Sequence, residues 1–267
     1  MADREFMKRM ALGIEYDGTG WHGWQKQPDG LTVQDALESA IFQFTQTRIA
    51  TTCAGRTDAG VHATEQVVHL DTSIDRRPDS WVRGLNTWLP PSVAVRWACE
   101  VPGGPEGFHA RSSAVRRRYR YLLYNSPVRS PLWHHRAGWV FRPLDIDQMR
   151  EGAGHLLGEH DFSAFRAAEC QSVTPWKTLH TVQIERQGNL IVFTFEANAF
   201  LHHMIRNIVG SLVYVGKGNH PPEWMAELLA GKDRSKAAPT FMPDGLYLSR
   251  IFYDPVWGLP QRDDVFP

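Results

Sequence analysis

The chain has 267 residues, 42% of them hydrophobic and 22% charged, and its formal net charge at pH 7 is zero. This length supports one large domain or two moderate ones. No run of 18 or more apolar residues occurs, so no membrane span is expected. The first nine residues lack the features of a signal peptide, and Cys53, Cys99 and Cys170 form neither a disulfide framework nor a metal-ligand pair. A reduced, cytoplasmic setting is expected.

The first part of the chain predicts a β-α-β-α-β succession, which indicates helices packed on a sheet. Residues 9–16 alternate as a strand, and residues 17–25 form a loop rich in Gly and Trp. Thr32 is expected to cap a helix, with Asp35 three residues on approximating a capping box. Further elements are expected at 66–70 (strand), 80–88 (helix) and 93–101 (strand).

A Pro- and Gly-rich break at residues 102–107 predicts a boundary between two halves, 1–105 and 106–267. The second half repeats the style of the first, although no residue-level repeat is visible. Gln187-Gly188 is expected to form a tight hairpin turn, and the tail from Pro255 to be irregular. The elements expected in this half are strands at 117–124, 178–186, 189–197 and 246–253, and helices at 146–157 and 201–215.

Positive charge is concentrated in one stretch of the chain. Residues 108–142 contain eight Arg and no Asp or Glu, whereas the segments on either side each carry four net negative charges. Arg suits phosphate oxygens and stacks on bases, and Tyr, Trp and His residues lie among these arginines. The pattern favours a surface for single-stranded or loop RNA. The alternative is a set of solvated arginines near an acidic domain or subunit.

Segment 53–63 places Asp58 among very small residues, with Arg56 two positions before it. Gly55 and Gly60 let the backbone turn sharply and a bulky ligand come close. A carboxylate held in such a loop is a candidate for chemistry. The plain alternative is a surface turn that contains an Asp.

Two residues of the second half are candidate partners for Asp58. Period two on strand 117–124 places Tyr119 on one face, where it can stack beneath a base or serve as a core aromatic. Arg206 lies beyond the edge of the apolar stripe of its helix, about 140° from Leu201. An Arg bordering the core requires an anionic partner, unless it is an ordinary surface arginine.

These segments, in this order, resemble the TruA family of tRNA pseudouridine synthases. The resemblance spans residues 10–253, and residues 237–241 depart from the family pattern, in which we expect a Gly after the first Ala and a small residue after Thr. The matching stretches are residues 16–19 with 24–25, 55–63, 108–111 with the Tyr119 strand, 161–165 and 204–210.

The resemblance implies a mixed α/β (α+β) pseudouridine synthase fold, in which two similar halves, each with a mostly antiparallel sheet and packed helices, flank a central basic cleft. It implies a homodimeric isomerase that converts uridine to pseudouridine at positions 38, 39 and 40 of the tRNA anticodon stem-loop, with no cofactor and no metal. By that likeness Asp58 is the nucleophile, Arg206 pairs with it, and Tyr119 packs against the target base.

The remaining candidate substrate contacts are arginines. The target uridine lies in a stem and must be flipped out of it. Arg56 is a candidate to fill the vacated space or hold the displaced strand, although a structural role in the loop is the alternative. Arg116 and Arg118, from the basic stretch, are expected to contact the RNA.

Two other functions compete with this interpretation. A non-catalytic tRNA-binding protein of the same fold is disfavoured because all three chemical residues are present. A hydrolase of glycosidic bonds would need a second carboxylate, for which Asp17, Glu65 and Asp161 are the acids near the motifs. The His residues at 134–135, 155, 160 and 202–203 lack the spacing of a metal-bearing helix, so no metal is expected.

Overall fold

The computed structural model describes residues 7–261 and groups them into two compact units. The first unit contains the described residues up to Val115 and those from Leu248 onward, and the second is Arg116–Tyr247. The division of the chain into halves 1–105 and 106–267 stays a prediction. Within residues 7–261, no helix is both long and apolar enough for a membrane span.

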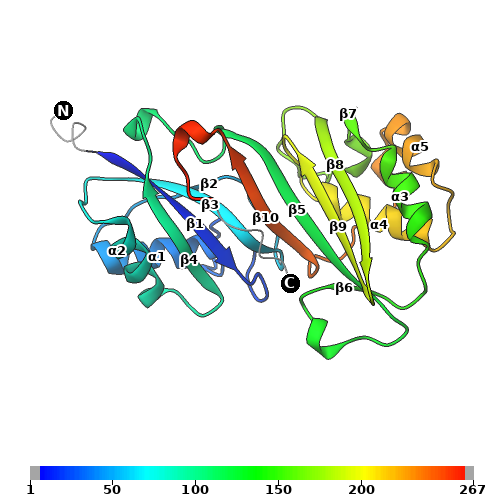
Figure 1. Cartoon of the computed structure of the whole chain (residues 1–267), viewed down its shortest axis with the longest axis horizontal. Helices are drawn as coiled ribbons and strands as arrows, with labels where there is room; N and C mark the ends of the chain where they lie inside the picture. The colour runs from blue at the N-terminus through cyan, green and yellow to red at the C-terminus, as the bar shows by residue number, and fades with distance from the viewer. Residues whose placement is uncertain (1–6, 262–267) are drawn as a thin grey trace. The chain divides into compact units, whose positions relative to one another are not determined.

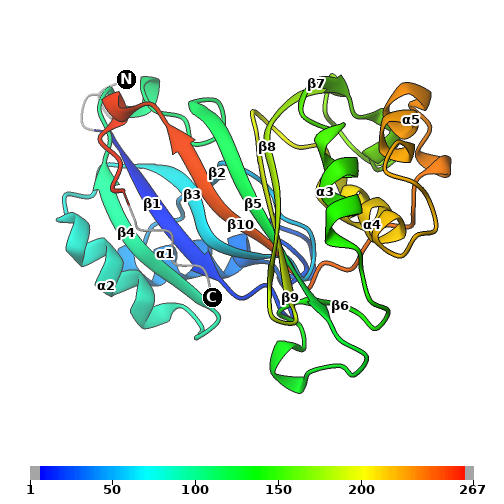
Figure 2. The same cartoon turned by 45° about the vertical axis from the view of Figure 1, so that its right-hand side comes forward.

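The first unit is a sheet with two helices, α1 and α2, against one of its faces (Figures 1 and 2). β1 lies between β3 and β4 and is antiparallel to both, while β2 pairs with β3. From Leu248 onward, β10 (Leu246–Tyr253) extends this sheet beside β3. The other elements are β1 (Lys8–Tyr16), α1 (Val33–Thr45), β2 (Thr52–Cys53), β3 (His62–Thr72), α2 (Pro78–Trp88) and β4 (Val93–Glu100).

The predicted helix cap at Thr32 is confirmed. The Thr32 hydroxyl accepts a hydrogen bond from the Asp35 backbone N–H at 3.2 Å and donates one to the Asp35 carboxylate at 2.5 Å. The Asp35 carboxylate therefore accepts its hydrogen bond from the Thr32 hydroxyl, whereas in a full capping box it would accept from the Thr32 backbone N–H. The helix that follows buries Val33, Leu37 and Ile41 against the sheet layer.

The second unit has strands in the order β5-β9-β8-β7, with neighbouring strands antiparallel, and β6 pairs in parallel with β5. Three helices, α3, α4 and α5, gather beside β8 and β9 (Figure 2). α4 is the most enclosed, because eleven of its thirteen residues are buried. The elements are β5 (Ala114–Asn125), β6 (Gly138–Val140), α3 (Ile146–Gly154), β7 (Gly158–Asp161), β8 (Trp176–Gln187), β9 (Leu190–Ala197), α4 (Met204–Gly216) and α5 (Trp224–Gly231).

Several predicted boundaries are wrong. The strand expected at 66–70 begins at His62, so the end of segment 53–63 already belongs to the sheet. The helix expected at 201–215 begins at Met204, because His203 has a φ of 60° that interrupts a helix. In the hairpin, Gln187 still pairs with Leu190, so the turn is Gly188-Asn189.

The helix expected to reach residue 157 ends at Gly154, where the chain tightens and Leu156 N–H bonds to the Ala153 carbonyl at 3.1 Å. The tail is not wholly irregular, since Pro255–Trp257 forms a 3-10 turn. Four elements were not predicted, namely β2, β6, β7 and α5. The other 3-10 turns are Gly104–Glu106, Pro131–Trp133, Ser163–Phe165 and Arg234–Lys236.

Candidate active site

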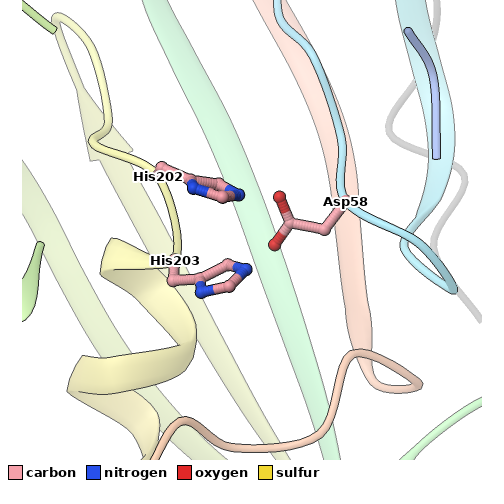
Figure 3. Close-up of side chains that lie close together, drawn as sticks. All are labelled: Asp58, His202 and His203. Atoms are coloured by element: carbon pink, nitrogen blue, oxygen red, sulfur yellow. The ribbon is translucent and has the colours of Figure 1, made fainter. Parts of the chain in front are cut away.

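Asp58 lies in the loop between β2 and β3, and it is half-buried (Figure 3). The backbone on both sides of it is held by residues 17–25. The Thr57 carbonyl accepts a hydrogen bond from Trp24 N–H at 3.0 Å, and Gly60 N–H donates to the Trp21 carbonyl at 3.3 Å. The Asp58 carbonyl accepts from Val61 N–H at 3.2 Å, which closes the turn.

The two loops approach each other so closely that a glycine is required at the contact. Gly23 has a φ of +87°, and a Cβ added there would lie 2.7 Å from the Thr57 carbonyl oxygen. The hydroxyls of Tyr16 and Thr57 share a hydrogen bond at 2.7 Å. Gln66, which is fully buried, accepts from Gly55 N–H and donates to the Gly55 carbonyl. Asp58 therefore projects from a loop whose backbone is fixed at both ends.

Tyr119 is on β5, and its ring packs edge-on against Phe200 with 5.1 Å between ring centroids. Tyr121, two residues on, is fully buried, and burial raises the pKa of its phenol well above the usual value. The Tyr121 hydroxyl donates to the Met242 carbonyl at 2.9 Å. Tyr119, which the sequence analysis placed on one face of this strand, and Tyr121, two residues on, are both buried, and Tyr121 is in a structural position.

Arg116 and Arg118 share a partner that the sequence analysis missed. The guanidinium of Arg118 contacts a Glu196 carboxylate oxygen at 2.6 Å, and that of Arg116 lies 3.5 Å from the other oxygen. Glu196 is on β9 and its side chain is 10% exposed, compared with 21% for Arg118 and 45% for Arg116. The available signal was that Glu196 is the single charged residue of β9, whose other residues are apolar apart from Thr194, since a buried carboxylate needs a cation.

Arg206 lies in the first turn of α4 and is half-buried. Its Nε donates to the Phe241 carbonyl at 2.8 Å. Just before the helix, the rings of His202 and His203 lie side by side with centroids 4.0 Å apart (Figure 3). The prediction placed Leu201 in the apolar stripe of this helix, but the helix begins at Met204, so Leu201 lies outside it.

The second unit thus brings Tyr119, Arg116, Arg118 and Arg206 onto one strand and one helix start, while the first unit carries Asp58 and the exposed Arg56. The pairing of Arg206 with Asp58 stays a prediction.

Two acids near the motifs have structural contacts. Asp17 accepts from Thr19 N–H at 2.9 Å. Asp161 accepts from both the N–H and the hydroxyl of Ser163, and Lys232 lies 3.3 Å from its other oxygen. The three cysteines are free thiols.

The family model for tRNA pseudouridine synthase matches residues 13–104 and 153–254. The tRNA pseudouridine synthase A of Herminiimonas arsenicoxydans is 64% identical over 257 residues, which is 96% of this chain and 94% of the relative. That of Janthinobacterium sp. (strain Marseille) is 62% identical over 96% of each chain. Among solved structures, a Cbf5-Nop10-Gar1 complex matches 76% of this chain and 45% of that chain at 11% identity, with a TM-score of 0.37.

The chain thus combines a mixed α/β fold, a mostly antiparallel sheet and a carboxylate fixed in a loop of small residues, and it matches a family of RNA-modifying enzymes. The chain belongs to the tRNA pseudouridine synthase family. It is an isomerase that acts on uridine in tRNA.

Proposed function

We propose that the chain converts uridine to pseudouridine at positions 38, 39 and 40 of the tRNA anticodon stem-loop. We further propose that it works in the cytoplasm as a homodimer, with no cofactor or metal, and binds the RNA in a basic cleft. The observation that carries the proposal is the fixed loop of Asp58 within a chain 64% identical to a tRNA pseudouridine synthase A.

The reaction breaks the bond between C1′ of the ribose and N1 of uracil, rotates the base, and joins C5 to C1′. In the proposed mechanism the Asp58 carboxylate acts as the nucleophile at the sugar. It must be ionised to do so, and pairing with the Arg206 guanidinium favours the charged form. The ring of Tyr119 packs against the detached uracil, and this apolar contact holds the base in place while keeping water away from it.

The arginines have separate proposed roles. Arg56 is exposed in the same loop as Asp58, where it can occupy the space left by the flipped nucleotide. Arg116, the more exposed member of the pair on Glu196, binds a phosphate. Arg118 contacts the substrate from a site where Glu196 already fixes its direction.

The test is incubation of the purified protein with an unmodified tRNA transcript that has uridines at positions 38–40, followed by mapping of pseudouridine. We expect product at these positions and none when each is replaced by cytidine. Pseudouridine only at other positions of the tRNA would contradict the proposed positions, but it would still agree with an isomerase that acts on tRNA.

The same assay separates the two competing functions. Release of free uracil would identify a glycosidic hydrolase. If both the wild type and Asp58→Ala bind tRNA and neither forms product, the chain is a non-catalytic binding protein.

A further inference from the structure

Residues 237–242, which we name the clamp segment, lie against the first turns of α4. Phe241 and Arg206 exchange two hydrogen bonds. Phe241 N–H donates to the Arg206 carbonyl at 3.3 Å, and the Phe241 carbonyl accepts from Arg206 Nε at 2.8 Å. A Cβ added to Gly210, one turn along, would lie 2.6 Å from the Pro239 carbonyl oxygen. The clamp segment therefore packs against α4 so closely that Gly210 has no room for a side chain.

The clamp segment is tied to the helix by a buried amide. Asn207 is fully buried, and its Nδ2 donates to the Phe165 carbonyl at 2.8 Å. Its Oδ1 accepts from the Thr240 hydroxyl at 2.7 Å and from Arg234 at 3.0 Å. Both the Nδ2 and the Oδ1 of Asn207 thus have partners, so the orientation of this side chain is fixed.

Thr240 connects the Asn207 amide to the Phe241 carbonyl, which is the hydrogen-bond acceptor of Arg206. Its hydroxyl donates to Asn207 and accepts from Arg234 at 3.1 Å, and its neighbour in the chain is Phe241. Arg234 also donates to the Ala238 carbonyl at 2.9 Å, and burial lowers its pKa. Among the interactions of the described residues, these contacts of Arg234 are all to neutral oxygens, which suits a purely structural cation.

A guanidinium has one Nε–H and two terminal nitrogens in a rigid plane. When Nε–H is bonded to a fixed carbonyl, the plane and the direction of the terminal nitrogens are fixed too. We propose that Thr240 and Asn207 are positioning residues that act through the Phe241 carbonyl to aim the Arg206 guanidinium. The inference rests on the proposed role of Arg206 and adds the residues that set its geometry.

The variant that tests this is Thr240→Val, which removes the hydroxyl, keeps the shape and changes a side chain that is exposed. We expect the single-turnover rate of pseudouridine formation to fall on the order of tenfold, as for a small misplacement of a reacting group. The affinity for tRNA should not change. Thr240→Ser keeps the hydroxyl and should restore the rate. Thr87→Val, which removes an exposed hydroxyl on α2, is the matched control.

A double-mutant cycle with Arg206→Lys shows whether the effect passes through Arg206. Lysine keeps the charge and has no Nε–H to hold, so Thr240→Val should cause no further loss in that background. Equal losses in both backgrounds, or no loss in wild type, would overturn the proposal.

A readout without turnover separates this proposal from the proposed function. The Nε–H signal of Arg206 in an NMR spectrum, identified by its absence in Arg206→Lys, should exchange slowly with water in wild type and Thr240→Ser. It should exchange faster in Thr240→Val. Unchanged exchange would contradict the positioning role even if the enzyme forms pseudouridine, and an inactive wild type with the expected exchange would contradict only the function.

Discussion

The two units hold their candidate site residues by different means. In the first unit, the backbone on both sides of Asp58 is held by backbone hydrogen bonds between two loops, residues 17–25 and the loop that carries Asp58. In the second, Arg206 and Arg118 are held by side-chain contacts with residues of other elements, the Phe241 carbonyl and Glu196. The first arrangement needs small residues at close contacts, and the second needs particular polar groups within hydrogen-bond reach of the arginines. Mutations in the first unit should therefore act by changing how closely the two loops pack. Mutations in the second unit should act by changing the charge or the direction of an arginine side chain.

The largest effect is expected for Asp58→Ala. If the Asp58 carboxylate is the nucleophile, its removal should lower the single-turnover rate on the order of 10³-fold or more. The affinity for tRNA should hold, because phosphate contacts dominate it. Rapid-quench measurement of pseudouridine and filter binding would check both values. Turnover near that of wild type would remove Asp58 from its proposed role.

The contact between the two loops can be broken with a pair of glycine substitutions. Gly23→Ala combines a positive φ with a clash against the Thr57 carbonyl, whereas Gly20, with a φ of +81°, has no atom within 4 Å of an added Cβ. We expect Gly20→Ala to cost about 1 kcal/mol of unfolding free energy and Gly23→Ala about 3 kcal/mol. Urea denaturation measures both. Equal losses would show that the close approach does not hold the loop.

The pair on Glu196 compares two arginines of the second unit. Arg118→Ala should lower the free energy of unfolding by about 2 kcal/mol, because Glu196 loses its nearer cation. Arg116→Ala should leave stability within about 0.5 kcal/mol and reduce the salt dependence of tRNA binding by about one phosphate contact. A salt slope that is unchanged in Arg116→Ala would contradict its proposed phosphate contact.

The smallest effect is expected for His69 in the first unit. Its side chain can titrate, whereas the backbone hydrogen bonds between the two loops cannot. Burial, together with the charge of Arg9, lowers the pKa of His69 from 6.5 to about 4. Its Nδ1 accepts a hydrogen bond from Ala110 N–H at 3.0 Å, which protonation would break. The unfolded chain takes up this proton near pH 6.5 and the folded chain only near pH 4, so stability falls as the pH is lowered through that range.

After allowance for solvent screening, the loss should amount to about 2 kcal/mol between pH 7 and pH 4. His69→Asn keeps an acceptor near the position of Nδ1 and cannot titrate, so its stability should vary less with pH. Urea midpoints of the two proteins that fall in parallel would contradict the assignment.

Much of the first unit was predictable because its signals are local. The strand at 9–16, the cap at Thr32 and the small residues around Asp58 each depend on neighbours within a few positions, and the structure contains all three. The errors came where tertiary contacts decide. His203 adopts a positive φ and delays α4, and the helix expected to reach residue 157 ends at Gly154.

The sequence by itself determined the order of the main strands and helices, the loop that presents Asp58, and the family. These follow from periodicity, caps and a run of residues in one segment. Only the tertiary structure showed that Glu196 pairs with Arg116 and Arg118, that Gly23 admits the Thr57 carbonyl, and that the clamp segment holds Arg206. Hydrogen bonds and ion pairs form between whichever groups the fold brings within about 3 Å, and neither separation in sequence nor residue type identifies those groups in advance.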